Sequence, residues 1–305
     1  MKKQYLIDAK YLSIPVAVDK ECALVEFFLI KEGQEPEKVM EFNIPMDRSG
    51  AQEYPTKYFT QLPVEEYQGE VLELCGDMAE TFCQAIYTTD EMNHIASSEI
   101  RPAIHFTADS GWTNDPNGMV YADGIYHLYY QYNPFDIVWN NMSWGHAVSP
   151  DMLHWEQKDP VMFPDENGTM YSGCAIRNDR ELLGLPKEAL IFFYTASGGV
   201  NPWSGDLEFT QRIAYSLDGG ETLVKMEDPC VPVIYKDTRD PKVFWHEESQ
   251  AYIMVLWTKG NDFAVLRSEN LKDWEMTHEF TLDGGWECPD LFNLKSPDGE
   301  SCWFF

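Results

Sequence analysis

Residues 112–118 read W-T-N-D-P-N-G and place one carboxylate, Asp115, at the start of a strand-like run. Asn, Asp, Pro and Gly favour tight turns, because Asn and Asp side chains bond to their own backbone and Gly tolerates positive φ. On its own the stretch is as typical of a polar turn as of a catalytic motif. Two further carboxylates downstream, Asp240 and Glu287, favour the catalytic interpretation.

The chain of 305 residues is long enough for one large domain and one small one. Its 51 acidic and 22 basic residues give a net charge of −29, which opposes binding to nucleic acid or to anionic membranes. The 10 Trp and 16 Tyr suit either sheet packing or stacking against sugar rings. We therefore expect no nucleic-acid partner, and the aromatics can serve both uses.

Seven cysteines are scattered without C-x-x-C spacing, which predicts reduced thiols and neither a zinc site nor a disulfide framework. No pair of His residues stands at ligand spacing, so we expect no metal and no cofactor. The N-terminus reaches Asp8 and Lys10 before an apolar segment forms, and no run of eighteen apolar residues occurs. The default expectation is a cytoplasmic protein, or a secreted or cell-surface protein if a leader has been removed.

Residues 1–100 alternate strand-like runs with polar turns and contain no catalytic cluster. We predict strands at residues 11–18, 23–31, 38–45, 69–74 and 81–88. The run 23–31 looks buried on both faces. This spacing predicts a small accessory β-sandwich-like domain over residues 1–100.

Residues 101–305 repeat one pattern, in which an acidic or polar turn residue is followed by an apolar strand rich in aromatics. A second marker, a turn that begins with serine, recurs at Ser149, Ser216 and Ser268. This spacing is typical of four-stranded propeller blades, and helical periodicity is nearly absent. We therefore predict an all-β fold with a β-propeller over residues 101–305. Asp115, Asp240 and Glu287 are each predicted at the head of a blade's first strand. Because the innermost strands of all blades begin at one end of the channel, the three carboxylates are expected to converge there.

The three carboxylates suit cleavage of a glycosidic bond with retention, in which an acid protonates the leaving oxygen and a carboxylate about 5 Å away attacks the anomeric carbon. Asp115 fits the nucleophile and Glu287 the acid, with Asp240 as an acceptor for substrate hydroxyls. Trp286 and Cys288 flank Glu287, so we expect poor solvation to raise the pKa of Glu287. A surface Arg-Asp pair is the alternative interpretation of Asp240.

Aromatic residues in these stretches are candidate stacking walls for a sugar, namely Trp112, Trp139, Tyr171 and Trp286. Each of these aromatic residues, taken alone, fits a core position better than a ligand platform. Residues 198–207 are expected to form a rim loop that contacts the leaving group.

Six motifs occur in unbroken order along the second part of the chain. They are W-T-N-D-P-N-G (112–118), Y-Y-Q-Y-N-P (129–134), W-G-H-A-V-S (144–149), Y-S-G (171–173), R-D-P-K-V-F-W (239–245) and W-E-C-P-D-L-F (286–292). Together they resemble glycoside hydrolase family 32, the β-fructofuranosidases that include invertases, levanases and inulinases. The resemblance runs from residue 104 to 305 and implies a five-bladed β-propeller with a retaining mechanism.

By this resemblance Asp115 is the nucleophile, Glu287 the acid/base, and Asp240, beside Arg239, the transition-state stabiliser. The fructose pocket is completed by Asn114, Gln131, Trp139 and Ser172. Thr113 and Asn140 depart from the residues usual in the family without removing a catalytic group. A family member would continue beyond residue 305 through a fifth blade and a C-terminal β-sandwich, so we expect the propeller of residues 101–305 to lack its last blade or blades.

The resulting hypothesis is a glycosidase that releases fructose from levan, inulin-type oligosaccharides or sucrose through a covalent fructosyl-enzyme intermediate. Residues 1–100 resemble a module that precedes the propeller in some levanase-like members, which favours fructans, whereas the missing leader favours sucrose or short oligosaccharides. A non-catalytic fructan-binding propeller, a fructosyltransferase and a glycosidase for arabinose-containing glycans are alternatives. Linkage preference, substrate length, exo or endo cleavage and oligomeric state stay open.

Overall fold

The computed structural model describes residues 1–93, 101–102 and 104–305. Within these residues nearly all regular structure is β-strand, and the helical elements are η1 (Glu65–Tyr67), α1 (Glu80–Ala85) and η2 (Pro202–Ser204). The predicted all-β fold is therefore confirmed. No helix in the described part of the chain is long and apolar enough to cross a membrane.

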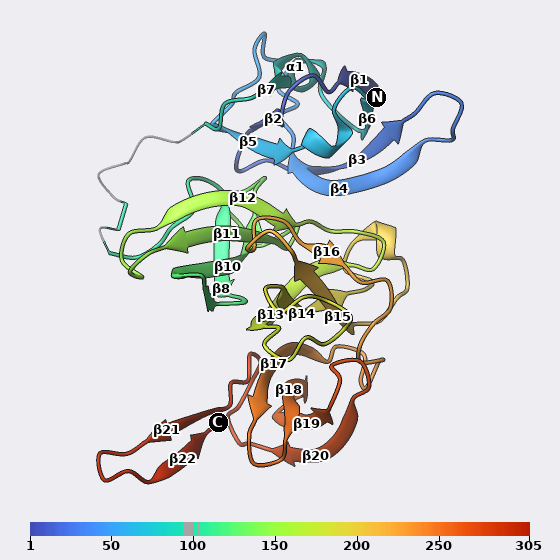
Figure 1. Ribbon diagram of the computed structural model, residues 1–305. Coiled ribbons are helices and arrows are strands. Elements are labelled where there is room, and N and C mark those ends of the chain that lie inside the picture. Colours follow the sequence, from blue (N-terminus) through green and yellow to red (C-terminus); the bar gives the residue numbers. More distant parts are fainter. Residues whose placement is uncertain (94–100, 103) are drawn as a thin grey trace.

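Two antiparallel sheets form the N-terminal part (Figure 1). One has the strand order β1 (Lys2–Leu6), β6 (Val71–Gly76), β3 (Cys22–Ile30), β4 (Glu37–Pro45), and the other the order β5 (Tyr58–Pro63), β2 (Tyr11–Val16), β7 (Tyr87–Thr89). Alternate residues of β3 are buried, with Val25 and Phe27 fully enclosed. This strand therefore has one core face, where two were expected. Phe135, from the later part of the chain, joins the same core.

Four of the five predicted N-terminal strands are present, as β2, β3, β4 and β6. The prediction of a strand at residues 81–88 is wrong, because α1 and the short β7 occupy this stretch. Phe82, Cys83 and Ile86 have the spacing of one helix face and are buried together in the core. The domain division at residue 100 stays a prediction, and residues 94–100 lie outside the described residues.

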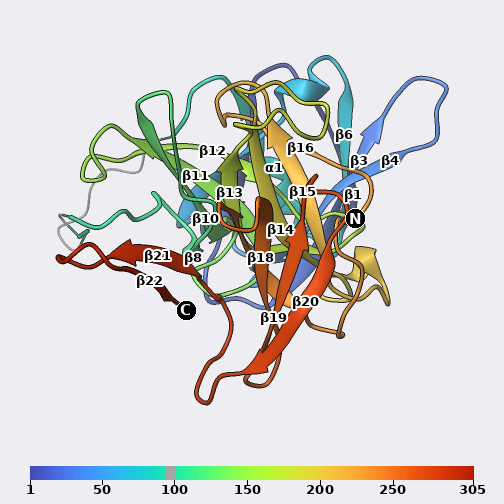
Figure 2. The same ribbon diagram turned by 60° about the horizontal axis from the view of Figure 1, so that its bottom comes forward.

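Three further antiparallel sheets follow along the chain, and each is a meander in which the strands are paired in chain order (Figures 1 and 2). The first contains β8 (Trp112–Pro116), β10 (Ile125–Asn133), β11 (Ser143–Ser149) and β12 (Glu156–Met162), with β9 (Val120–Ala122) paired to β10. The second contains β13 (Thr169–Arg177), β14 (Leu190–Ser197), β15 (Thr210–Ser216) and β16 (Val224–Lys225). The third contains β17 (Arg239–His246), β18 (Ala251–Lys259), β19 (Asp262–Ser268) and β20 (Glu275–Thr281), and a hairpin of β21 (Phe292–Lys295) and β22 (Ser301–Phe304) follows.

The repeated serine has one structural role in all three sheets, because it ends the third strand and starts the turn to the fourth. The hydroxyl of Ser149 accepts a hydrogen bond from a main-chain N–H three residues on, at 2.8 Å, and that of Ser268 does so at 2.9 Å. In the middle sheet Ser216 accepts from the N–H of Gly220 at 2.8 Å. Such local side-chain bonds favour turns over continued strand. The sequence repeat thus marks equivalent turns, as predicted for successive blades.

The first strand of each meander is interrupted where it carries a candidate site residue. The pairing of β8 with β10 shifts register opposite Asn114 and Asp115, that of β13 with β14 shifts at Tyr171 and Ser172, and that of β17 with β18 shifts at Asp240. Bulges of this kind re-aim side chains, and they occur often beside active sites. β13 packs against β17, so the interruptions at Ser172 and at Asp240 lie in neighbouring strands.

Candidate active site

A cavity of about 750 Å³ opens where the interrupted strands meet. Its lining includes the candidate site residues Asn114, Asp115, Gln131, Trp139, Tyr171, Ser172, Arg239, Asp240 and Glu287. The predicted convergence of the three carboxylates is therefore present in the structure. Two of the three carboxylates differ from the predicted place at the head of a strand, because Asp115 is the fourth of the five residues of β8 and Glu287 lies in the loop between β20 and β21.

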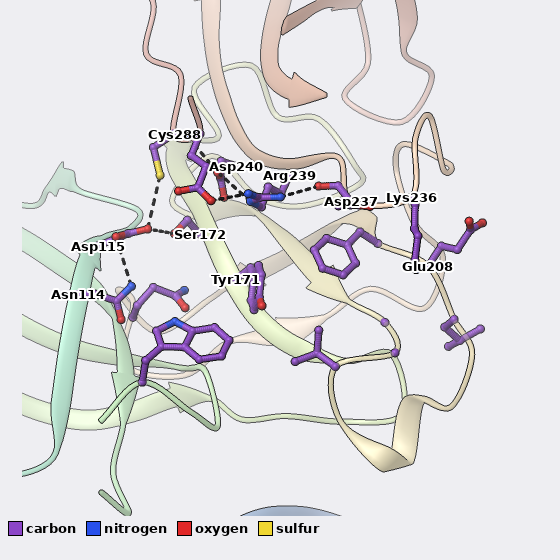
Figure 3. Close-up of a pocket in the computed structure, with 18 of the residues that line it drawn as sticks. Asn114, Asp115, Tyr171, Ser172, Glu208, Lys236, Asp237, Arg239, Asp240 and Cys288 are labelled. Carbon is purple, nitrogen blue, oxygen red and sulfur yellow. Dashed lines mark hydrogen bonds and ion pairs between the residues drawn. The ribbon is translucent and has the colours of Figure 1, made fainter. Parts of the chain in front are cut away.

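Asp115 is held by three neighbours (Figure 3). The hydroxyl of Ser172 donates to Oδ2 of Asp115 at 2.7 Å, and the side-chain amide of Asn114 donates to Oδ1 at 3.3 Å. The thiol of Cys288 lies 3.5 Å from the same Oδ2 atom. Donors on both oxygens fix the carboxylate plane, as an attacking or charge-stabilising group requires.

Ser172 and Gln131 are in turn joined by Asn117, a buried residue of the 112–118 motif that was not predicted as a site residue. In the amide orientation that satisfies its neighbours, Asn117 accepts from Nε2 of Gln131 at 2.9 Å and donates to the hydroxyl of Ser172 at 3.3 Å. Gln131 also donates to the carbonyl of Met170 at 2.8 Å. This buried chain of hydrogen bonds orients the hydroxyl of Ser172, which donates to Asp115.

Asp240 is the buried member of the three carboxylates, with 6% of its surface exposed. Its Oδ2 atom accepts the main-chain N–H of Cys288 at 3.0 Å, and its own N–H donates to Oγ1 of Thr195 at 3.0 Å. Burial raises the pKa of Asp240 to about 6, against the lowering effects of that N–H and of Arg239. The residue adopts a φ of 63°, a conformation rare outside glycine, which is often maintained at functional sites.

Arg239 connects Asp240 to Glu287. Its Nη2 atom donates to Oε1 of Glu287, and its Nε atom lies 3.7 Å from Oδ2 of Asp240. The guanidinium stands 3.9 Å from the ring centre of Trp257, and Nη1 donates to the carbonyl of Asp237 at 3.0 Å. The side chain is 13% exposed, so the interpretation of Arg239 and Asp240 as a surface pair is wrong.

The expected desolvation of Glu287 is also wrong. Its side chain is 46% exposed and faces Arg239, while the neighbouring Trp286 is 70% exposed. Neighbouring residues in a loop need not point to the same side, so Trp286 does not enclose the carboxylate of Glu287. Glu287 and Cys288 have φ values of 51° and 39°, and this backbone turn places the N–H of Cys288 against Asp240.

Two of the four predicted aromatic walls line the cavity. The rings of Trp139 and Tyr171 meet edge to face at 6.0 Å, and Tyr171 meets Phe209, which was not predicted, at 5.4 Å. Trp112 and Trp286 are not among the lining residues, which corrects the prediction for both. The indole of Trp112 instead donates to Oδ1 of Asn114 at 2.9 Å, so it orients the amide that contacts Asp115.

The predicted rim loop contributes Gly198, Gly199, Val200, Gly205, Asp206 and Leu207 to the lining. Figure 3 shows Glu208 and Lys236, which continue this rim, on the side of the cavity opposite Asp115. Across the residues that the structure describes, no group of three or more His, Cys, Asp or Glu side chains is arranged to hold a metal ion. The lining of the cavity offers carboxylates, amides and hydroxyls, together with the guanidinium of Arg239, the ammonium of Lys236 and the thiol of Cys288.

A family profile described as "Glycosyl hydrolases family 32 N-terminal domain" matches residues 105–305. The chain belongs to glycosyl hydrolase family 32. Levanase from Bacillus subtilis is 42% identical to it over 206 residues, which are 64% of this chain and 29% of the levanase. Family 32 membership agrees with the resemblance of the six motifs.

Solved structures of the family share the fold. An exo-inulinase from Aspergillus awamori superposes with a TM-score of 0.62 at 35% identity, over 70% of this chain and 46% of the inulinase. A fructofuranosidase from Schwanniomyces occidentalis, solved in complex with fructose, gives a TM-score of 0.61 at 36% identity, over 67% of this chain and 42% of that chain. The chain thus spans less than half the length of these family 32 relatives.

Proposed function

We propose that the chain carries the active site of a retaining β-fructosidase and belongs to a five-bladed β-propeller preceded by an accessory domain at residues 1–100. The observation that carries this proposal is the cavity in which Asp115, Asp240 and Glu287 meet around Arg239. The levanase and inulinase relatives supply the substrate class. The substrate is a β-linked terminal fructose unit of levan, of an inulin-type oligosaccharide or of sucrose.

In this proposal Asp115 attacks the anomeric carbon of fructose. A nucleophilic carboxylate must stay ionised and must present one oxygen in a fixed direction. Ser172 and Asn114 each donate a hydrogen bond to Asp115, which limits rotation of the carboxylate. The product of the attack is a covalent fructosyl-enzyme ester.

Glu287 protonates the glycosidic oxygen as the bond breaks and then takes a proton from the incoming water. Its half-exposed position leaves access for water in the second step. The contact with Arg239 fixes the side chain of Glu287 at the edge of the cavity. Hydrolysis and transfer to a second sugar diverge only at this step, because both begin from the same covalent intermediate.

Asp240 accepts hydrogen bonds from fructose hydroxyls. Such bonds strengthen as the ring acquires oxocarbenium character, so they stabilise the transition state more than the ground state. The main-chain N–H of Cys288 donates to Oδ2 of Asp240, and the main-chain N–H of Asp240 donates to Thr195, so neither contact uses Oδ1. Asp240 is therefore available to a substrate on its Oδ1 side.

The test is fructose release from sucrose, inulin-type oligomers and levan in the presence of methanol. Water and methanol compete for the covalent intermediate, and a retaining enzyme forms methyl β-fructofuranoside. Asp115→Asn should lose both products, while Asp218→Asn, in the turn after β15, should keep them. Formation of the α-methyl product would contradict retention. Wild-type protein that releases no fructose would contradict the assignment of β-fructosidase activity.

A further inference from the structure

A strand of the N-terminal part holds the loop that lines one side of the cavity. Eight residues between Gly198 and Phe209 line the cavity. The loop closes on itself, since the N–H of Leu207 donates to the carbonyl of Ser204 at 3.2 Å, and a Cβ atom at Gly198 would stand 2.7 Å from Leu207. Its tip is η2, which extends away from the cavity toward β4.

Glu41 of β4 meets this tip. Its Oε1 atom accepts the main-chain N–H of Trp203 at 2.9 Å, although the two residues are 162 positions apart. The other oxygen accepts the ammonium of Lys38 at 2.7 Å, and this ammonium stands 5.0 Å from the ring centre of Trp203. The side chain of Glu41 is 1% exposed. Every polar atom of the carboxylate is thus used, and one of its partners is the loop.

A second contact from the same strand reaches the opposite wall. The N–H of Asn43 donates to Oδ1 of Asn141 at 2.8 Å, and Nδ2 of Asn141 donates back to the carbonyl of Asn43 at 2.9 Å. Asn141 stands two residues after Trp139, which lines the cavity. Glu41 and Asn43, two positions apart in β4, therefore contact segments from both sides of the cavity mouth. Trp139 and Val200 also flank the small cavity between β4 and the mouth.

A buried ion pair is a poor way to add stability, because desolvation of the charges offsets most of their attraction and an apolar pair of similar size does as well. What it supplies is a unique geometry, because a displaced partner leaves a buried charge without a hydrogen bond. The Glu41 carboxylate thus restricts η2 to one position. The residues that follow η2, from Gly205 to Phe209, line the cavity, and Figure 3 shows one of them, Glu208, on the far side of the cavity from Asp115.

We infer that Glu41 is a positioning residue for the leaving-group side of the cavity, through which the N-terminal sheet sets the affinity for the sugar attached to the cleaved fructose. This inference rests on the proposed function. It assigns the N-terminal part a role in substrate selection within the catalytic cavity. Asp115, Asp240 and Glu287 lie at the other end, so their chemistry does not depend on Glu41.

The test compares Glu41→Gln with Glu73→Gln. Glu73 is a control in the same sheet, because its carboxylate also accepts a lysine, Lys2, while its other contacts, with Gln4 and Cys75, lie outside the cavity lining. The substrates are an inulin-type trisaccharide and β-fructosyl fluoride, whose leaving group is a single atom that reaches no rim residue. Amide hydrogen exchange over residues 198–209 is measured on the same samples.

For Glu41→Gln we expect the KM for the trisaccharide to rise about tenfold, because one charge-assisted contact is lost, and we expect kcat to stay nearly unchanged. The kinetic constants for the fluoride should stay at the wild-type values, and exchange over residues 198–209 should accelerate. Glu73→Gln should change none of these. Unchanged exchange in Glu41→Gln, or an equal loss on fluoride and trisaccharide, would overturn the inference. Wild-type protein that releases no fructose would contradict the proposed function, while the exchange measurement would still judge the link between Glu41 and the loop.

Discussion

The main-chain N–H of Cys288 donates to Oδ2 of Asp240 at 3.0 Å. This one bond fixes the loop that carries Glu287 to the strand that carries Asp240, across 48 residues of sequence. The thiol of the same Cys288 lies 3.5 Å from Asp115. Three carboxylates from separate parts of the chain are therefore tied together through a single residue, and their relative positions do not depend on a ligand.

The raised pKa of Asp240 predicts a pH-dependent cost in stability. The unfolded carboxyl loses its proton near its ordinary value of 3.8, whereas the folded one keeps it to about pH 6. The folded state thus binds more protons in this interval, and the free energy of unfolding falls as pH rises. Asp240→Asn removes this effect, so its stability relative to wild type should increase by about 2 kcal/mol between about pH 4.5 and 7.5.

Urea unfolding of both proteins at the two pH values measures this difference. Because every other carboxylate is common to wild type and variant, their contributions largely cancel in the comparison. If the difference in unfolding free energy between the two proteins is the same at both pH values, burial does not hold the proton on Asp240.

Removal of the Ser172 hydroxyl should weaken catalysis without unfolding the protein. Ser172→Ala leaves Oδ2 of Asp115 without its closest donor, and a hydrogen bond to a charged group contributes about 1.5–3 kcal/mol. We expect kcat/KM for fructose release to fall about 10- to 100-fold. Ser216→Ala, which removes another buried serine bonded to an aspartate, is the control and should keep the wild-type value.

Arg239 should not be replaceable by lysine. The guanidinium contacts Glu287, the carbonyl of Asp237 and the face of Trp257 at once, and a lysine ammonium cannot reproduce this planar fork. Arg239→Lys should lower kcat/KM by about tenfold or more. Arg267→Lys, in a surface pair with Glu269, should leave the rate constant unchanged. A fully active Arg239→Lys protein would mean that charge alone is required at this position.

The hydrogen bond between Thr195 and the main chain of Asp240 gives a prediction for stability. Oγ1 of Thr195 accepts the N–H of Asp240 at 3.0 Å and donates to Gln211 at 2.7 Å. Thr195→Val leaves that buried N–H without a partner, which costs about 1–3 kcal/mol. Thr258→Val is a matched control, because the buried hydroxyl of Thr258 has no hydrogen-bond partner among the described residues. Thermal unfolding should therefore show destabilisation only in Thr195→Val.

The convergence of Asp115, Asp240 and Glu287 could be predicted because the sequence repeat indicates propeller blades, and a propeller brings the first strands of successive blades together at one end of its channel. The surroundings of Glu287 could not be predicted from the sequence. Its sequence neighbours, Trp286 and Cys288, suggest an apolar pocket, but the loop turns Trp286 to solvent and supplies Arg239 from 48 positions away.

The same limit applies to Thr195 beneath Asp240 and to Glu41 beneath the rim loop. Each contact joins residues far apart in the chain, and neither side chain carries a local pattern that marks it. Asn117 and Cys288 are different, because they lie inside the motifs 112–118 and 286–292, which also contain Asp115 and Glu287. Their position within a motif was the available signal, and the hydrogen bonds of the fold give it a physical meaning.

The division of labour between Asp115 and Glu287 is tested most directly by leaving groups of different basicity. Glu287→Gln is assayed for the first turnover of sucrose and of β-fructosyl fluoride, because fluoride departs without a proton. The rate for sucrose should fall about 10²- to 10⁴-fold, which is the usual contribution of a general acid, while the rate for the fluoride should change little. Asp115→Asn should lose both. An equal loss on the two substrates in Glu287→Gln, or no loss on sucrose, would contradict the role of Glu287 as the acid.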